Sequence, residues 1–225
     1  VCDVMPLRGL NRAFVRQGLR IMERRERTGL RHLMEVAGVK ATPTAFSCGF
    51  SIGPRINAGG RIAEADLGLS LLLTQDATDA QRMAERLDAV NRRRQDVESE
   101  ILDRAMMQAQ EQFDAGQPVL FLTGADWHPG VVGIVASRVK GRFNRPVLVG
   151  AEQADGSCKG SGRSVPGLDL GTVVIAAREQ GLLTTGGGHA MAAGFSLPTE
   201  RVPEFHAFLS TRLHAANDLP ERPVR

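Results

Sequence analysis

Three short segments of the 225-residue chain combine glycine with side chains that can hold a phosphate group. They are residues 55–61 (Arg-Ile-Asn-Ala-Gly-Gly-Arg), 159–164 (Lys-Gly-Ser-Gly-Arg-Ser) and 186–189 (Gly-Gly-Gly-His). Glycine lets a ligand approach the backbone amides, and the planar arginine fork matches two phosphate oxygens. The histidine can donate a hydrogen bond to such an oxygen or transfer a proton. The candidate phosphate-binding residues are therefore Arg55, Asn57, Arg61, Ser161, Arg163, Ser164, Gly187, Gly188 and His189, and His189 is also a candidate catalytic residue.

Each segment also has a purely structural explanation. Residues 46–63 are predicted to form a loop, because the three glycines and the proline within 53–61 would break a helix or a strand. Residues 159–164 fit a tight turn or a bulge, and they lack the glycine, lysine and serine order of a Walker loop. Residues 186–188 are predicted to form a turn, although three successive glycines cost backbone entropy. Composition alone leaves the phosphate-binding and the structural interpretations open.

Asp3 is a further candidate, because it lies within the apolar run of residues 1–7. A carboxylate in such a run is costly to bury unless it is paired or bound to a metal. By itself the residue is ambiguous between a cap and a metal ligand. The chain has no His-x-x-x-His or Cys-x-x-Cys pattern that would mark another metal site.

The composition is that of a globular protein, with 42% hydrophobic and 24% charged residues. It excludes a disordered tail and a collagen-like fibre. No window approaches the roughly 18 uncharged apolar residues that cross a bilayer, and no signal-peptide core is visible. The three cysteines form neither a disulfide framework nor a zinc pattern, which favours a cytoplasmic location. Because residue 1 is Val, the chain is expected to be a fragment of a longer protein.

Residues 76–113 contain no glycine and no proline, and their apolar residues recur at three-, four- and seven-residue spacings. This pattern predicts one long amphipathic helix. At 1.5 Å per residue it would reach roughly 55 Å, which suits a connection between two lobes. The expected organisation is a first lobe over 1–75, a connecting helix over 76–115, a second lobe over 116–217 and a linker over 218–225.

After residue 116, short apolar strands alternate with helices. This alternation predicts an α/β fold, with a small mixed-sheet domain in the second lobe. Strands are expected at 119–122, 146–149, 157–163 and 192–197, and helices at 129–143, 170–178 and 200–216. A shorter helix is expected earlier, at 64–74.

Near the start of the chain, arginine recurs every four residues from Arg8 to Arg24. On a helix this spacing forms one slowly drifting basic row. A solvated helix face is the simpler interpretation, and a phosphate-facing surface is the alternative. The net charge of +3 permits an anionic partner without requiring one.

Segments along essentially the whole chain, taken together and in order, resemble the RecJ family of single-strand-specific DNA exonucleases, in the DHH phosphoesterase superfamily. The family loop usually has Ala where this chain has Gly59. The matching segments are residues 1–7 (Val-Cys-Asp-Val-Met-Pro-Leu), 11–19, 53–61 (Gly-Pro-Arg-Ile-Asn-Ala-Gly-Gly-Arg), 127–138 (Trp-His-Pro-Gly-Val-Val-Gly-Ile-Val-Ala-Ser-Arg), 159–164 and 187–194.

The resemblance implies a metal-dependent nuclease of DNA repair and recombination that releases mononucleotides from the 5′ end of single-stranded DNA. Two Mn²⁺ or Mg²⁺ ions would activate a water in the N-terminal lobe, and Asp3 would be the last metal-ligand aspartate of that lobe. Asn57 and Arg61 would line the cleft between the lobes. Single-stranded DNA is the expected partner, with a single-strand-binding protein or helicase as further partners, no membrane, and a monomeric state. The phosphate oxygens of the terminal nucleotide would be held by Arg163, Ser164, Gly188 and His189.

The chain departs from the family pattern because the Asp-His-His motif and the upstream aspartates are missing. The fragment alone is therefore expected to be inactive. The family's oligonucleotide-binding barrel is also missing. Two alternatives stay open: a DHH-family oligoribonuclease or cyclic-dinucleotide phosphodiesterase, which shares the Gly-Gly-His cluster, and a module that only binds nucleic acid. The long helix and residues 127–138 favour the RecJ interpretation.

Overall fold

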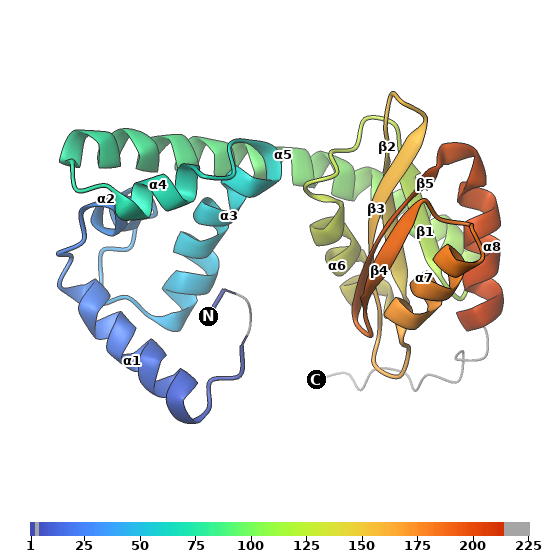
Figure 1. Ribbon diagram of the computed structural model, residues 1–225, viewed down its shortest axis with the longest axis horizontal. Coiled ribbons are helices and arrows are strands. Elements are labelled where there is room, and N and C mark those ends of the chain that lie inside the picture. The colour runs from blue at the N-terminus through green and yellow to red at the C-terminus, as the bar shows by residue number, and fades with distance from the viewer. Residues whose placement is uncertain (3–4, 214–225) are drawn as a thin grey trace. The chain divides into compact units, whose positions relative to one another are not determined.

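The computed structural model describes residues 1–2 and 5–213, and the chain divides into two compact units at Asp96 and Val97 (Figure 1). Helix α5 (Ala77–Asp114) has 38 residues and contributes to both units. This confirms the predicted α/β fold with two lobes joined by a long helix. The division falls inside α5, and the boundaries expected from the sequence stay predictions. The expected linker over 218–225 lies outside the described residues.

The first unit is helical. Its core lies between α2, α4, the segment before α3 and the first half of α5, and it buries seven apolar side chains. The core residues are Leu33, Met34, Ile52, Leu71, Ala80, Ala84 and Leu87. The elements before α5 are α1 (Gly9–Glu23), α2 (Thr28–Val36), the π-helical turn η1 (Ser47–Ile52), α3 (Gly53–Ile62) and α4 (Leu67–Leu73).

The predicted loop over 46–63 is wrong, because η1 and α3 form one continuous helical run. Pro54 lies in the first turn of α3, where its missing N–H and fixed φ are tolerated. Gly53 is required by close packing, because a Cβ there would lie 2.4 Å from the Cys2 sulfur. Gly53 therefore allows two segments of the chain to pack closely and does not mark a loop.

The second unit holds a five-stranded sheet in the order β1-β2-β3-β5-β4. β1 and β2 are parallel and connected through α6, and the other neighbours are antiparallel. The elements are β1 (Leu120–Gly124), α6 (Val132–Phe143), β2 (Val147–Glu152), β3 (Ser157–Arg163), α7 (Leu170–Glu179), β4 (Thr185–His189), β5 (Ala192–Pro198), the 3₁₀ turn η2 (Thr199–Arg201) and α8 (Val202–Leu213).

The turn predicted at 186–188 is also wrong, because these glycines form the edge strand β4. A Cβ on Gly171, in the first turn of α7, would lie 2.9 Å from the backbone of Gly188 and His189. A Cβ on Gly188 would lie 2.3 Å from the Ala192 carbonyl oxygen. The glycines therefore let helix and strand backbones approach each other.

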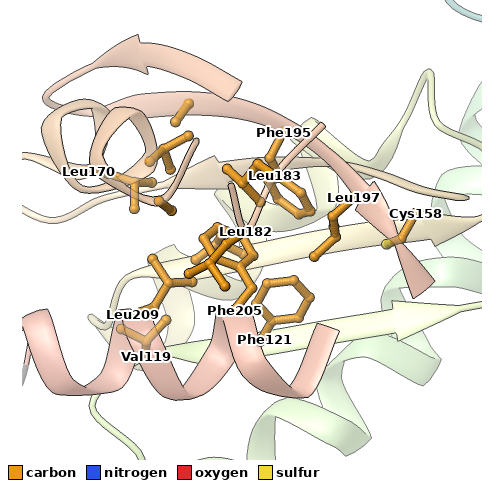
Figure 2. Close-up of a cluster of buried hydrophobic side chains, with 14 of the residues drawn as sticks. Val119, Phe121, Cys158, Leu170, Leu182, Leu183, Phe195, Leu197, Phe205 and Leu209 are labelled. Atoms are coloured by element: carbon orange, nitrogen blue, oxygen red, sulfur yellow. The ribbon is translucent and has the colours of Figure 1, made fainter. Parts of the chain in front are cut away.

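The sheet carries α6 on one face and α7 with α8 on the other (Figure 1). Phe121, Phe195 and Phe205 pack together between the sheet and α8, with ring centroids 5.5 to 5.7 Å apart. Figure 2 shows these rings among the leucines of α7, α8 and the strands. His206 closes the edge of this core, with its Nε2 3.0 Å from the Val119 carbonyl oxygen.

The outer edge of β1 is capped by two glutamines of α5. Gln112 accepts a hydrogen bond from the Phe121 N–H at 2.8 Å and donates one to the Phe121 carbonyl at 2.7 Å. Gln108 makes the same pair of bonds with Thr123 at 3.1 and 2.9 Å. Four helix residues advance about 6 Å, close to the length of two strand residues, so both amides meet the edge in register. An edge that would otherwise expose unpaired backbone groups is closed.

We expect Cys2 and Cys158 to differ sharply in their reactivity toward alkylating reagents. Burial raises the pKa of the Cys158 thiol to about 12, so it stays protonated and shielded near neutral pH. Cys2 is exposed. Mass spectrometry after brief iodoacetamide treatment should find Cys2 alkylated and Cys158 unmodified until denaturant is added. Rapid labelling of Cys158 in the native protein would contradict this burial.

Among the described residues, no helix has the length and apolar character needed to cross a membrane.

Candidate phosphate-binding site

The register of β3, β5 and β4 brings two of the candidate segments to one face of the sheet. Arg163 on β3 and His189 on β4 both pair with Ala192 on the strand between them. Directly paired residues point to the same side of a sheet, and two strand spacings separate them by about 9.5 Å. Arg163 and His189 therefore flank Ala192 on a common face.

The next row on that face consists of Ser161, Gly194 and Gly187. A Cβ on Gly187 would meet no atom within 4 Å, and one on Gly194 would meet only the Gly160 carbonyl oxygen at 3.9 Å. Helix α6 packs on β2 and β3. We call the open backbone of Gly187, which is half-buried, and of Gly194, which is exposed, the glycine surface. It lets a ligand contact β4 and β5 directly, beside Ser161 on β3.

Arg163 is held against the first turns of α6. Its Nε donates to the Ser137 hydroxyl at 3.2 Å, and its Nη1 donates to the Gly162 carbonyl at 2.8 Å. Nη2 would lie 3.0 Å from a Cβ on Gly133, so glycine gives the guanidinium room there. The positive end of the α6 dipole and the guanidinium thus lie together, an arrangement that attracts an anion.

His189 is exposed at the end of β4, beside the N-terminus of α7. Asp169 caps that helix by accepting from the Thr172 N–H at 3.0 Å. This hydrogen bond is the main cause that lowers the pKa of Asp169, and the nearby His189 charge adds to the effect. The cap contributes stability above the ordinary aspartate pKa and loses it as pH falls through the lowered value.

Ser164 and Gly188 differ from their expected surroundings. Ser164 is 1% exposed, and its hydroxyl donates to the Leu168 carbonyl at 2.8 Å. Its backbone N–H donates to the Met191 carbonyl at 3.0 Å, which fixes the turn after β3. Gly188 pairs with Ala193, whose side chain is buried in the core on the other side of the sheet. Both residues therefore stabilise the fold through these contacts. Their expected phosphate contacts stay predictions.

The remaining candidates lie on α3 in the first unit. Arg55 donates from Nε to Asp88 at 2.8 Å and from Nη1 to the Ser51 carbonyl at 2.6 Å. Asp88 also pairs with Arg92 at 2.6 Å, so Arg55 is part of a half-buried ion-pair network. Asn57 and Arg61 are exposed and lie four residues apart on one face of α3. Of the three, Asn57 and Arg61 present exposed polar groups to a ligand.

Asp3, the single expected metal ligand, lies outside the described residues. Within residues 1–2 and 5–213, no three His, Cys, Asp or Glu side chains are grouped so that they could hold a metal ion. The described part of the chain therefore does not fit a two-metal centre by itself.

Residues 116–215 match the family model described as the DHHA1 domain. The single-stranded-DNA-specific exonuclease RecJ of Dickeya dadantii is 43% identical over 213 residues, covering 91% of this chain and 37% of that protein. The RecJ of Bacillus subtilis is 36% identical over 212 residues, covering 93% and 27%. The crystal structure of RecJ from Thermus thermophilus in complex with Mg²⁺ has a TM-score of 0.86 at 39% identity, covering all of this chain and 34% of that one. This chain belongs to the RecJ family.

The chain spans about a third of the length of these RecJ proteins. A second Thermus RecJ structure is in complex with Mn²⁺, so divalent metals are bound within the family. The matched DHHA1 region contains the sheet face formed by Ser161, Arg163, Gly187 and His189. In this RecJ segment, the resemblance found in the sequence is confirmed at the level of family and fold.

Sequence reasoning missed three residues that shape this face. Ser137 accepts a hydrogen bond from Arg163, Gly133 makes room for its guanidinium, and Asp169 places a charge near His189. Ser137 and Gly133 lie inside the matched segment 127–138, so their four-residue spacing on one helix face was a usable signal. Asp169 followed by Thr172 is a helix-capping pattern, but nothing in the sequence places it beside His189.

Proposed function

We propose that this chain is part of a RecJ-type exonuclease that degrades single-stranded DNA from its 5′ end and releases mononucleotides. Single-stranded-DNA-specific exonuclease is the activity named for its curated relatives. A role in DNA repair and recombination in the cytoplasm follows from that activity. The face formed by β3, β5 and β4 binds the terminal nucleotide.

The observation that carries the proposal is the pairing of Arg163 and His189 with the same residue of β5. This register brings two distant sequence motifs to one face of the sheet, about 9.5 Å apart. The arginine fork binds phosphate oxygens, and the imidazole donates to an oxygen whose charge grows as the phosphodiester is cleaved. The glycine surface in the neighbouring row of the same face leaves space for the sugar and the backbone of the substrate.

The metal chemistry of the proposed reaction is assigned to residues outside those described. We propose that Asp3 joins ligands of the longer protein to hold Mn²⁺ or Mg²⁺, the ions present in the related structures. One carboxylate cannot assemble such a centre, so the 225-residue chain alone should show no nuclease activity. Asn57 and Arg61 remain proposed substrate contacts.

The direct test is nuclease activity of the full-length protein, compared with that of the 225-residue chain. The substrates are end-labelled single-stranded DNA, duplex DNA and short RNA, each with Mn²⁺ or Mg²⁺. We expect mononucleotides from the 5′ end of single-stranded DNA with the full-length protein and no product with the short chain. Preference for short RNA would favour an oligoribonuclease, and binding without cleavage would favour a binding module.

Replacing Arg163 with alanine should weaken binding of single-stranded DNA and flatten its dependence on salt. Loss of one phosphate contact lowers the slope of log K against log salt by about 0.7 on a single strand. Fluorescence anisotropy of the full-length protein, measured in chelator so that no cleavage occurs, gives this slope. An unchanged slope in a folded variant would show that Arg163 has only a structural role, through its hydrogen bonds to Ser137 and Gly162.

A further inference from the structure

Five arginines that the proposed nucleotide site does not use lie along helix α1: three inside it, with one at the N-cap and one at the C-cap. Inside the helix, the four-residue spacing of Arg12, Arg16 and Arg20 puts neighbouring guanidinium groups one helical turn apart, on one drifting face. The five side chains are exposed, and within the described residues none of them forms an ion pair or a side-chain hydrogen bond. The row consists of Arg8, Arg12, Arg16, Arg20 and Arg24.

Such a row is unfavourable for the helix itself. Like charges four residues apart repel each other and destabilise an isolated helix. Glu23 is the only acidic residue between positions 8 and 24, and it accepts a hydrogen bond from the Thr42 hydroxyl at 2.7 Å. Met22 of α1 packs against the core of the first unit, but the arginines are exposed, so packing does not explain them. An anionic partner that neutralises several arginines at once does explain it.

The surface beside the row is shaped for close approach. Gly9 and Ala13 follow the arginines at the same four-residue spacing, and their small side chains leave the helix backbone accessible. The exposed apolar residues Leu10 and Phe14 lie on another face and do not interrupt the row. A shallow hollow runs along it, lined by Gly9, Arg12, Ala13, Arg16, Gln17 and Arg20.

We propose that the arginine row of α1 is a second DNA-binding surface, which holds successive phosphates of the single strand at a place other than the terminal-nucleotide site. This proposal rests on the proposed function, because it takes its anion from the substrate of that function. Arginine contacts to phosphates carry no sequence information, so binding along α1 is independent of sequence. The surface increases affinity for long strands without taking part in bond cleavage.

The test compares two triple variants of the full-length protein. The first is Arg12→Gln with Arg16→Gln and Arg20→Gln. The control is Arg93→Gln with Arg104→Gln and Arg142→Gln, three exposed arginines elsewhere on the surface that give the same change in charge. Glutamine has nearly the helix propensity of arginine, so α1 should stay helical, which circular dichroism checks.

Binding of a long oligothymidylate is measured across salt concentrations in chelator. Three lost contacts should lower the slope by about 2, so that between about 50 and 200 mM salt the wild type loses about 20-fold more affinity than the α1 variant. The control should keep the wild-type slope. Cleavage of a trinucleotide should be unchanged in both variants.

An unchanged slope in the α1 variant, or an equal loss in the control, would overturn the proposal. An unchanged slope together with a lower melting temperature would assign the row to an acidic surface of the same protein instead. The wild-type protein reports separately on the proposed function, because failure to cleave single-stranded DNA would appear there whatever the α1 variant does.

Discussion

Replacing His189 with alanine in the full-length protein should lower the turnover of single-stranded DNA by about 10²-fold or more, the usual loss when one donor to a developing oxyanion is removed. His189 is exposed at the end of β4, so the loss should come without unfolding. Binding of the strand in chelator should change far less than turnover, because the imidazole is proposed to act on charge that grows during cleavage. Single-turnover cleavage and anisotropy measure the two quantities.

Thr185 provides the matched control for this variant. It lies on the same strand and the same face as His189, four residues away, and it is also exposed. Thr185→Ala should keep both turnover and thermal stability. A near-normal rate for His189→Ala would remove the imidazole from the reaction, and an equal loss in both variants would indicate that β4 had been disturbed.

The elements that sequence reasoning predicted correctly are those whose periodicity does not depend on distant contacts. The long helix expected at 76–113 is found at Ala77–Asp114, and the strand expected at 157–163 has those bounds. Of the basic row expected on one helix, Arg12, Arg16 and Arg20 lie on α1, whereas Arg8 and Arg24 are its N-cap and C-cap residues. In these regions the spacing of residues along the sequence was sufficient to predict the element.

The two wrong predictions share one physical cause. At both 46–63 and 186–188, glycine was interpreted as a signal of a loop or turn. In the structure, Gly53 makes room for Cys2, and Gly188 makes room for the backbone of β5. Close approach between segments distant in sequence also selects glycine, and the sequence alone does not distinguish that cause from a turn.

The candidate site shows the same limit. The segments containing Arg163 and His189 could be selected from residue types alone, but their shared neighbour Ala192 follows only from strand order and register. Arg55 is the opposite case. Its residue type is that expected of a phosphate ligand, but its side chain forms an ion pair with Asp88. Residue type selects candidates, and tertiary contacts decide which of them face a ligand.

Replacing Gln112 with alanine should destabilise the second unit by about 2–4 kcal/mol, because it leaves two buried backbone groups of Phe121 without partners. Phe121 is only 5% exposed, so water cannot readily replace the amide. Gln108→Ala should cost less, since Thr123 is half-buried. Urea denaturation measures the change in free energy, and hydrogen exchange of the Phe121 and Thr123 amides reports on the strand edge itself.

Two further variants separate the hydrogen bonds from packing. Gln110 is exposed on the same helix and bonds to Asp114, so Gln110→Ala should lose only a few tenths of a kcal/mol. Gln112→Met keeps the volume of the side chain but removes both hydrogen bonds, so it should be nearly as destabilising as alanine. Wild-type stability in the methionine variant would show that α5 supports β1 by packing rather than by completing its edge. Loss of amide protection confined to Phe121 and Thr123 would instead show that two glutamines one turn apart serve as the missing neighbour strand.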